Sequence, residues 1–292
     1  MSPVDATAHP AGLLAPSARW PGTFREGRRM KGWSDPAPNT RWIRRSGGHS
    51  QPALRLICLP NAGAGASMFN GWSLPDPLRA EIWAVQPPGR ENRRQEPAFR
   101  RLDQLVPQLA EQLVPALDVP YALLGHSMGA LLAFELCREL RHRRAPLPVR
   151  LFVSAHRAPD LPPWRPAAST LPPPQFRARL AEMAGPSSVG RIDPELLDFL
   201  APMIRADFEL CETYRYRPQE PLTMPITCFT AVDDPEVRVD EMLGWQRHTT
   251  GTCQVYPFTG GHLFLRDHAA DVLGCVAADL AAEPAEVPGG AE

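Results

Sequence analysis

Residues 121–140 read YALLGHSMGALLAFELCREL and set a G-x-S-x-G pentapeptide, Gly125 to Gly129, between two apolar segments. The run before it, Tyr121 to Leu124, is short and continuously apolar, which is typical of a central parallel strand buried on both faces. The run after it, Met128 to Leu140, is apolar all round with few breakers, which is typical of a buried helix. The two glycines leave room where a strand and a helix approach closely. A strand, a tight turn and a helix would lift Ser127 above the sheet edge, so Ser127 is the candidate nucleophile.

The chain on both sides of this unit alternates strand-like and helix-like segments. Strands are predicted at 54–59, 82–86, 149–155, 226–232 and 253–258, and helices at about 102–117, 240–248 and 269–282. This alternation predicts βαβ units, and hence an α/β fold with a mostly parallel sheet flanked by helices. The six cysteines contain no C-x-x-C pair, and three of them fall inside predicted strands, where a free thiol behaves as a small buried hydrophobe. We therefore expect neither a disulfide framework nor a zinc site.

Proline and glycine mark the boundaries of the α/β domain, which we assign to residues 51–282. Residues 1–50 mix Pro, Gly, Ser and Arg without sustained periodicity and are predicted to form a largely disordered extension. Residues 283–292 are predicted to be a flexible tail. Residues 156–225 interrupt the alternation with a proline-rich entry and three helical segments, at 176–183, 194–200 and 203–216. We interpret this interval as a helical lid insertion over the carboxyl edge of the sheet, with a separate small helical domain as the alternative.

Composition narrows the possible partners and the location. The chain has 292 residues, 43% of them hydrophobic, and a formal net charge of -1. A near-neutral charge gives no general attraction for nucleic acid or for a membrane surface. No stretch approaches the roughly 18 consecutive apolar residues that a membrane-spanning helix needs, and the first residues lack the apolar segment of a secretory signal. We expect a cytoplasmic protein.

A serine nucleophile requires an imidazole to take its proton and a carboxylate to orient that imidazole. In this type of sheet the partners follow the serine in the order acid, then histidine, each past the carboxyl end of a strand. The predicted strand 226–232 leads into Asp233-Asp234-Pro235, and the strand 253–258 leads into Thr259-Gly260-Gly261-His262. His262 is therefore the candidate base. Asp234 is the preferred acid because the following proline restricts its backbone, and Asp233 is the alternative.

Five other histidines are less suitable as the base. They lie in the turn next to Ser127, on predicted helices, at the start of the insertion or in the last loop: His126, His142, His248, His156 and His268. The oxyanion formed on attack needs two hydrogen-bond donors. The N–H of the residue after the nucleophile, Met128, supplies the first. Ala62, in the small-residue loop after the first predicted strand, is the candidate for the second, with Gly63 as runner-up. The alternative is that this loop is rich in small residues only for tight packing.

These motifs, taken together, resemble those of the type II thioesterases that accompany polyketide synthases and nonribosomal peptide synthetases. The similar segments, in order, are TRWIRR (40–45), LPNAGA (59–64), VQPPGRENR (85–93), GHSMGA (125–130), SAHRAP (154–159), DPEV (234–237) and GGHLFL (260–265). The chain departs from the usual family pattern at Asn61, Ala64 and Asn92, where that pattern commonly has His, Gly and Asp. Residues 1 to about 30 have no counterpart in the family.

The resemblance implies an α/β-hydrolase fold and hydrolysis of acyl groups from the phosphopantetheine arms of acyl or peptidyl carrier proteins. Such an enzyme removes aberrant or stalled chains and requires no metal or organic cofactor. The insertion at 156–225 would then line the acyl chamber. Two other readings stay open: another serine esterase or product-releasing thioesterase of the same fold, and a non-catalytic binding protein of that fold.

Overall fold

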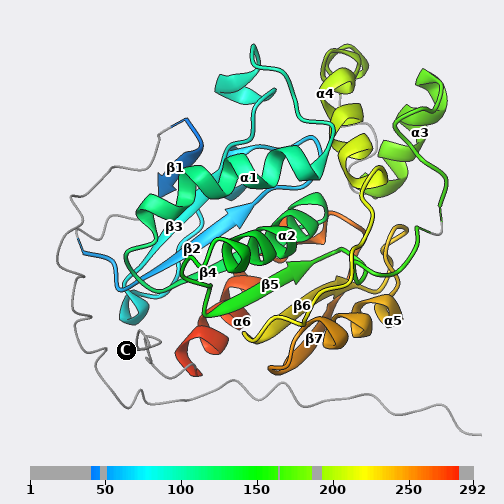
Figure 1. Ribbon diagram of the computed structural model, residues 1–292. Helices are drawn as coiled ribbons and strands as arrows, with labels where there is room; N and C mark the ends of the chain where they lie inside the picture. The colour runs from blue at the N-terminus through cyan, green and yellow to red at the C-terminus, as the bar shows by residue number, and fades with distance from the viewer. Residues whose placement is uncertain (1–40, 47–50, 164, 186–192, 283–292) are drawn as a thin grey trace, which may run out of the picture.

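A seven-stranded sheet forms the centre of the computed structural model, which describes residues 41–46, 51–163, 165–185 and 193–282 (Figure 1). The strands are β1 (Ile43–Ser46), β2 (Leu54–Leu59), β3 (Ala80–Val85), β4 (Tyr121–His126), β5 (Arg150–Ser154), β6 (Ile226–Ala231) and β7 (Cys253–Phe258). Their spatial order is β1-β3-β2-β4-β5-β6-β7. Only β1 runs antiparallel to its neighbour; every other adjacent pair is parallel. The carboxyl ends of β2 to β7 therefore meet at one edge of the sheet.

Helices cover both faces of this sheet and one end of it. They are α1 (Leu102–Leu113), α2 (Met128–His142), α3 (Pro173–Ala184), α4 (Pro194–Glu212), the short α5 (Val239–Met242) and α6 (Ala269–Ala282). Figure 1 shows α1 and α2 in front of the sheet, α6 behind it, and α3 and α4 near each other beyond one end of the strands. The mostly parallel sheet flanked by helices is as predicted.

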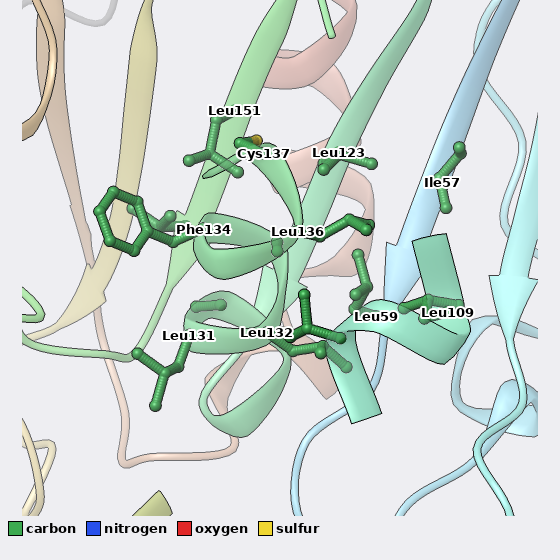
Figure 2. Close-up of a cluster of buried hydrophobic side chains, with 14 of the residues drawn as sticks. Ile57, Leu59, Leu109, Leu123, Leu131, Leu132, Phe134, Leu136, Cys137 and Leu151 are labelled. Carbon is green, nitrogen blue, oxygen red and sulfur yellow. The ribbon is translucent and has the colours of Figure 1, made fainter. Parts of the chain in front are cut away.

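Two apolar layers hold the helices to the sheet, because successive side chains of a strand point to opposite faces. Ile57 and Leu123 face α1 and α2, where they meet Leu109 and Leu136 in the cluster that Figure 2 shows. The alternate strand residues, Leu56 and Leu124 among them, pack with the α6 side chains Val272 and Val276. Every residue of β2 to β6 is buried, which explains why these strands are rich in apolar residues on both faces rather than alternating apolar with polar residues.

The first strand and the fourth helix correct two expectations. Residues 43–46 fall within the segment predicted to be largely disordered, yet they form β1 at the sheet edge. Trp42 and Ile43 are buried there, and the Arg93 guanidinium lies 4.3 Å from the centre of the Trp42 ring. The remainder of the predicted extension (1–40 and 47–50) and the predicted tail (283–292) lie outside the described residues.

Helix α4 joins the segments predicted separately at 194–200 and 203–216, with Pro202 inside it, and ends at Glu212, before the second predicted segment does. Asp193 caps its start by accepting the Glu195 N–H at 2.9 Å. Pro202 is exposed, so the carbonyl that loses its N–H partner is on the side open to water, while Ile204 and Leu210 are buried. Leu197 and Leu200 before the proline and Met203 after it pack against the same small apolar cluster, so tertiary contacts hold the helix on both sides of Pro202.

Candidate active site

Ser127 lies on a sharp turn between β4 and α2, with φ of 54° and ψ of -117°. A non-glycine residue in this region is strained, and such strain persists only where the surrounding structure enforces it. The Ser127 N–H donates to the Ser154 carbonyl of β5 at 2.7 Å. A Cβ atom on Gly125 would lie 2.1 Å from the Gly129 carbonyl oxygen, so the turn can be this tight only with glycine at position 125.

His262 lies between the serine and a carboxylate. Its Nε2 is 2.8 Å from Ser127 Oγ, and its Nδ1 is 2.9 Å and 3.0 Å from the two oxygens of Asp234. When Nδ1 carries the proton and donates it to the carboxylate in a hydrogen bond, Nε2 has a free lone pair. Nε2 can then accept a hydrogen bond from the serine hydroxyl. Burial disfavours the charged imidazolium, but the Asp234 carboxylate more than offsets this, and the pKa of His262 is raised above its ordinary value of 6.5.

Asp234 is held by the turn that follows β6. Its Oδ1 accepts the N–H of Glu236 at 2.8 Å and that of Val237 at 3.3 Å, and its side chain is fully buried. Asp233 is exposed, and its backbone N–H donates to the Gly260 carbonyl at 3.2 Å. The structure therefore brings Asp234, and not Asp233, to the imidazole.

His126 is buried beside His262, with ring centres 5.8 Å apart. Its Nδ1 lies 2.8 Å from Ser154 Oγ, so the ring is directed at β5 rather than at Ser127. Burial lowers the pKa of His126, and the nearby His262 lowers it further. His126 is therefore a neutral neighbour of the candidate base.

The other histidines among the described residues take part in other contacts or lie at the surface. His248 bonds Asp160, and His268 lies within hydrogen-bond distance of Thr259 and Asp271. His156 is within hydrogen-bond distance of the Arg157 carbonyl, and burial lowers its pKa to about 3. His142 is exposed on α2.

The two candidate oxyanion donors are backbone N–H groups of adjoining segments. Met128 is the first residue of α2, where a helix leaves its N–H groups without partners inside the helix. A Cβ atom on Gly129 would lie 2.1 Å from the Leu59 carbonyl oxygen and 2.8 Å from that of Pro60, so α2 starts against the loop that holds Ala62. Among the described residues, neither the Ala62 nor the Met128 N–H has a hydrogen-bond partner. The runner-up, the Gly63 N–H, is already bonded to Asp207 at 2.8 Å.

Two groups that sequence analysis did not identify tie the insertion to the site. Glu236, two residues after Asp234, bonds Arg165 at 2.9 Å and Arg179 of α3 at 2.7 Å. Asp207 of α4 bonds Arg90, which follows β3. The signal available in the sequence is an aspartate at helical spacing from apolar residues of α4, with Met203 and Ile204 before it and Leu210 after it, which implies a buried charge in need of a partner.

Within the described part of the chain, no group of three or more His, Cys, Asp or Glu residues is arranged to hold a metal ion. No helix in that part combines the length and apolar character needed to cross a membrane.

A family model described as a thioesterase domain matches residues 54–280. The chain belongs to the thioesterase family. The thioesterase is 37% identical over 233 residues to the gramicidin S biosynthesis protein GrsT of Aneurinibacillus migulanus, a match that covers 80% of this chain and 91% of GrsT.

Solved structures agree with this assignment. BorB, the type II thioesterase from the borrelidin biosynthetic cluster, is similar with a TM-score of 0.71 and 36% identity, over 82% of this chain and 96% of BorB. RedJ, a thioesterase from the prodiginine pathway of Streptomyces coelicolor, has a TM-score of 0.73 and 34% identity, over 80% of this chain and 95% of RedJ. The predicted α/β-hydrolase fold, the resemblance to type II thioesterases and the assignment as a thioester hydrolase are confirmed.

Proposed function

We propose that the thioesterase hydrolyses acyl groups from the phosphopantetheine arms of carrier proteins, with Ser127 as nucleophile, His262 as general base and Asp234 as the group that orients it. One observation carries this proposal: both ring nitrogens of His262 are engaged, one by Ser127 Oγ and the other by Asp234. That chain of hydrogen bonds joins a weak nucleophile to a base and the base to a buried charge, which is what acyl transfer at a serine needs.

Acylation would begin when Ser127 Oγ attacks the thioester carbonyl carbon and its proton passes to His262 Nε2. The carbonyl π electrons move to the oxygen, which the N–H groups of Ala62 and Met128 would stabilise. The intermediate then collapses, the carbon–sulfur bond breaks, and the proton on His262 goes to the departing thiolate. Asp234 favours the imidazolium between these two proton transfers, consistent with the raised pKa of His262.

Deacylation would repeat the sequence with water. His262 takes a proton from a water molecule as that water attacks the acyl-serine carbonyl, and the same two N–H groups hold the oxygen. The carbon–oxygen bond to Ser127 then breaks, the proton returns to Ser127 Oγ, and a free carboxylic acid leaves. The residues present account for every bond and proton, so these steps call for no metal or organic cofactor.

We infer that the insertion at 156–225 is a lid that forms part of the acyl chamber. Its helices α3 and α4 are bonded, through Glu236 and Asp207, to loops at the carboxyl ends of β6 and β2. An editing role toward polyketide or nonribosomal peptide assembly is supported by the relatives, which include a type II thioesterase from a biosynthetic cluster. A cytoplasmic location is supported by six cysteines that are all free.

The test is intact-mass analysis of carrier proteins loaded with short acyl chains and incubated with the enzyme. We expect the wild type to clear the acyl group and Ser127→Ala to leave it, with Ser73→Ala, an exposed serine outside the site, as the matched control. If Ser127→Ala clears carriers as fast as the wild type, the mechanism is wrong. If the wild type turns over simple esters but no loaded carrier, the carrier substrate is wrong.

A further inference from the structure

Asp207, a residue of the lid helix α4, is hydrogen-bonded to the loop that follows β2. The Asp207 carboxylate is 1% exposed and accepts two hydrogen bonds from Arg90, at 2.7 Å and 2.8 Å. The oxygen that takes the 2.8 Å bond also accepts the Gly63 N–H, again at 2.8 Å. Helix α4 is thus bonded directly to the residue that follows Ala62.

The bond to Gly63 acts on a β-turn formed by residues 61–64. The Ala64 N–H donates to the Asn61 carbonyl at 3.1 Å and Gly63 has a φ of 80°, which are the marks of a type II β-turn. Type I and type II turns differ by a flip of the central peptide, here Ala62–Gly63. Both edges of that peptide are bonded: its N–H to Asp207, and its carbonyl to Asn61 Nδ2 at 2.8 Å. A flip would break both bonds and turn a carbonyl toward a buried carboxylate.

Arg90 and its neighbours make the support rigid. Besides Asp207, the Arg90 guanidinium donates to the Ala64 carbonyl at 3.1 Å, at the far end of the same turn. Gln86 donates to the Arg90 carbonyl at 3.1 Å and accepts the Ala66 N–H at 2.6 Å. The segment after β3 therefore holds the loop from one side while α4 holds it from the other.

A buried ion pair by itself is weak evidence for any role beyond structure. The bond to the Gly63 N–H is different, because it specifies one backbone form of the loop next to the reacting atoms. The Ala62 N–H belongs to the preceding peptide, Asn61–Ala62, which this bond does not orient directly. We propose that Asp207 is a positioning residue: through Gly63 it holds the turn in one form and one place, and so keeps the neighbouring Ala62 N–H within reach of the oxygen that becomes negative. This inference rests on the proposed role of Ala62 as an oxyanion donor.

The experiment compares Asp207→Ala and Asp207→Asn with Glu209→Gln, using a p-nitrophenyl ester as substrate. Glu209 lies on the same helix and pairs with Arg100 at the surface, so its variant controls for the loss of an ion pair from α4. Complete removal of an oxyanion donor costs about 100- to 1000-fold in kcat, so displacing one should cost roughly 10- to 100-fold in Asp207→Ala, with KM within about twofold. Asp207→Asn keeps an oxygen for the Gly63 N–H and should lose less. Glu209→Gln should match the wild type.

The final extent of fluorophosphonate labelling gives the number of folded, reactive active sites. We therefore express kcat per labelled site, so that a misfolded fraction does not lower the measured kcat. The rate of labelling is a second readout, because negative charge also develops on oxygen in that reaction. A kcat per site and a labelling rate within twofold of wild type in Asp207→Ala would overturn the proposal, as would a rise in KM alone. Wild-type hydrolysis of the ester without hydrolysis of loaded carriers would overturn the proposed carrier substrate and leave the role of Asp207 intact.

Discussion

Replacing Gly129 with alanine is the sharpest perturbation of how the two oxyanion donors are placed. The added Cβ would lie 2.1 Å from the Leu59 carbonyl oxygen, whereas ordinary van der Waals contact begins at 3.4 Å. The obstacle is backbone at the end of β2, with no flexible side chain that could move aside. The start of α2 and the loop after β2 must therefore separate by about 1 Å, because the packed interior cannot absorb the overlap.

That separation would move the two oxyanion donors apart, because Met128 lies on α2 and Ala62 lies in the loop after β2. A misplacement of about 1 Å can cost roughly 100-fold in rate, or about 2.7 kcal/mol of transition-state stabilisation. We also expect a loss of about 1–3 kcal/mol in the free energy of unfolding from overpacking. The assay is kcat for hydrolysis of a simple ester together with urea denaturation.

Gly274→Ala is the matched control for Gly129→Ala. Gly274 lies in α6, where an added Cβ would meet nothing within 4 Å. This variant should keep the wild-type kcat and gain about 0.5–1 kcal/mol in stability from helix propensity. A folded Gly129→Ala enzyme with kcat within threefold of wild type would refute the argument that close approach of α2 and β2 sets the site.

Two further predictions follow from the charge and the packing described above. His262 must be neutral to accept a proton, and its pKa is raised, so kcat/KM should fall as pH drops through an inflection above 6.5. The variant Asp234→Asn should move that inflection to lower pH and reduce kcat by up to about 10⁴-fold. A wild-type inflection below pH 6, measured by a pH–rate profile, would contradict this reasoning. Leu109→Ala should lower the free energy of unfolding by about 2–5 kcal/mol in urea titrations, since Leu109 is fully buried, while Leu196→Ala, at a position 50% exposed, should change it little; equal losses in the two variants would show that burial is not the cause.

The parts of the site that could be predicted are those that follow buried strands directly. β4, β6 and β7 run parallel in one sheet, so the residues just past their carboxyl ends lie at the same edge of the sheet. This placement does not depend on the conformation of the connecting loops. Ser127, Asp234 and His262 all occupy such places, which is why local patterns sufficed to select them. The choice between Asp233 and Asp234 was harder, because it depends on which side chain the turn buries.

The features that escaped prediction depend on contacts between distant parts of the chain. Arg90 and Asp207 are 117 positions apart, and no local window shows that one will neutralise the other. β1 has only four residues, two of them exposed arginines, so its pattern is too short to stand out without the neighbouring strand. Pro202 normally predicts a break, and α4 continues only because tertiary packing outweighs the local preference.

The strained backbone of Ser127 has a practical consequence for anyone who handles this protein. The conformation at φ of 54° exists only while β4, α2 and the Ser154 carbonyl enforce it, and a partly unfolded chain relaxes to ordinary angles. A serine-reactive fluorescent probe would then measure the quality of a preparation. The labelled fraction of total protein, followed through storage, heating or expression in cells, gives the fraction of molecules that keep the strained turn at Ser127.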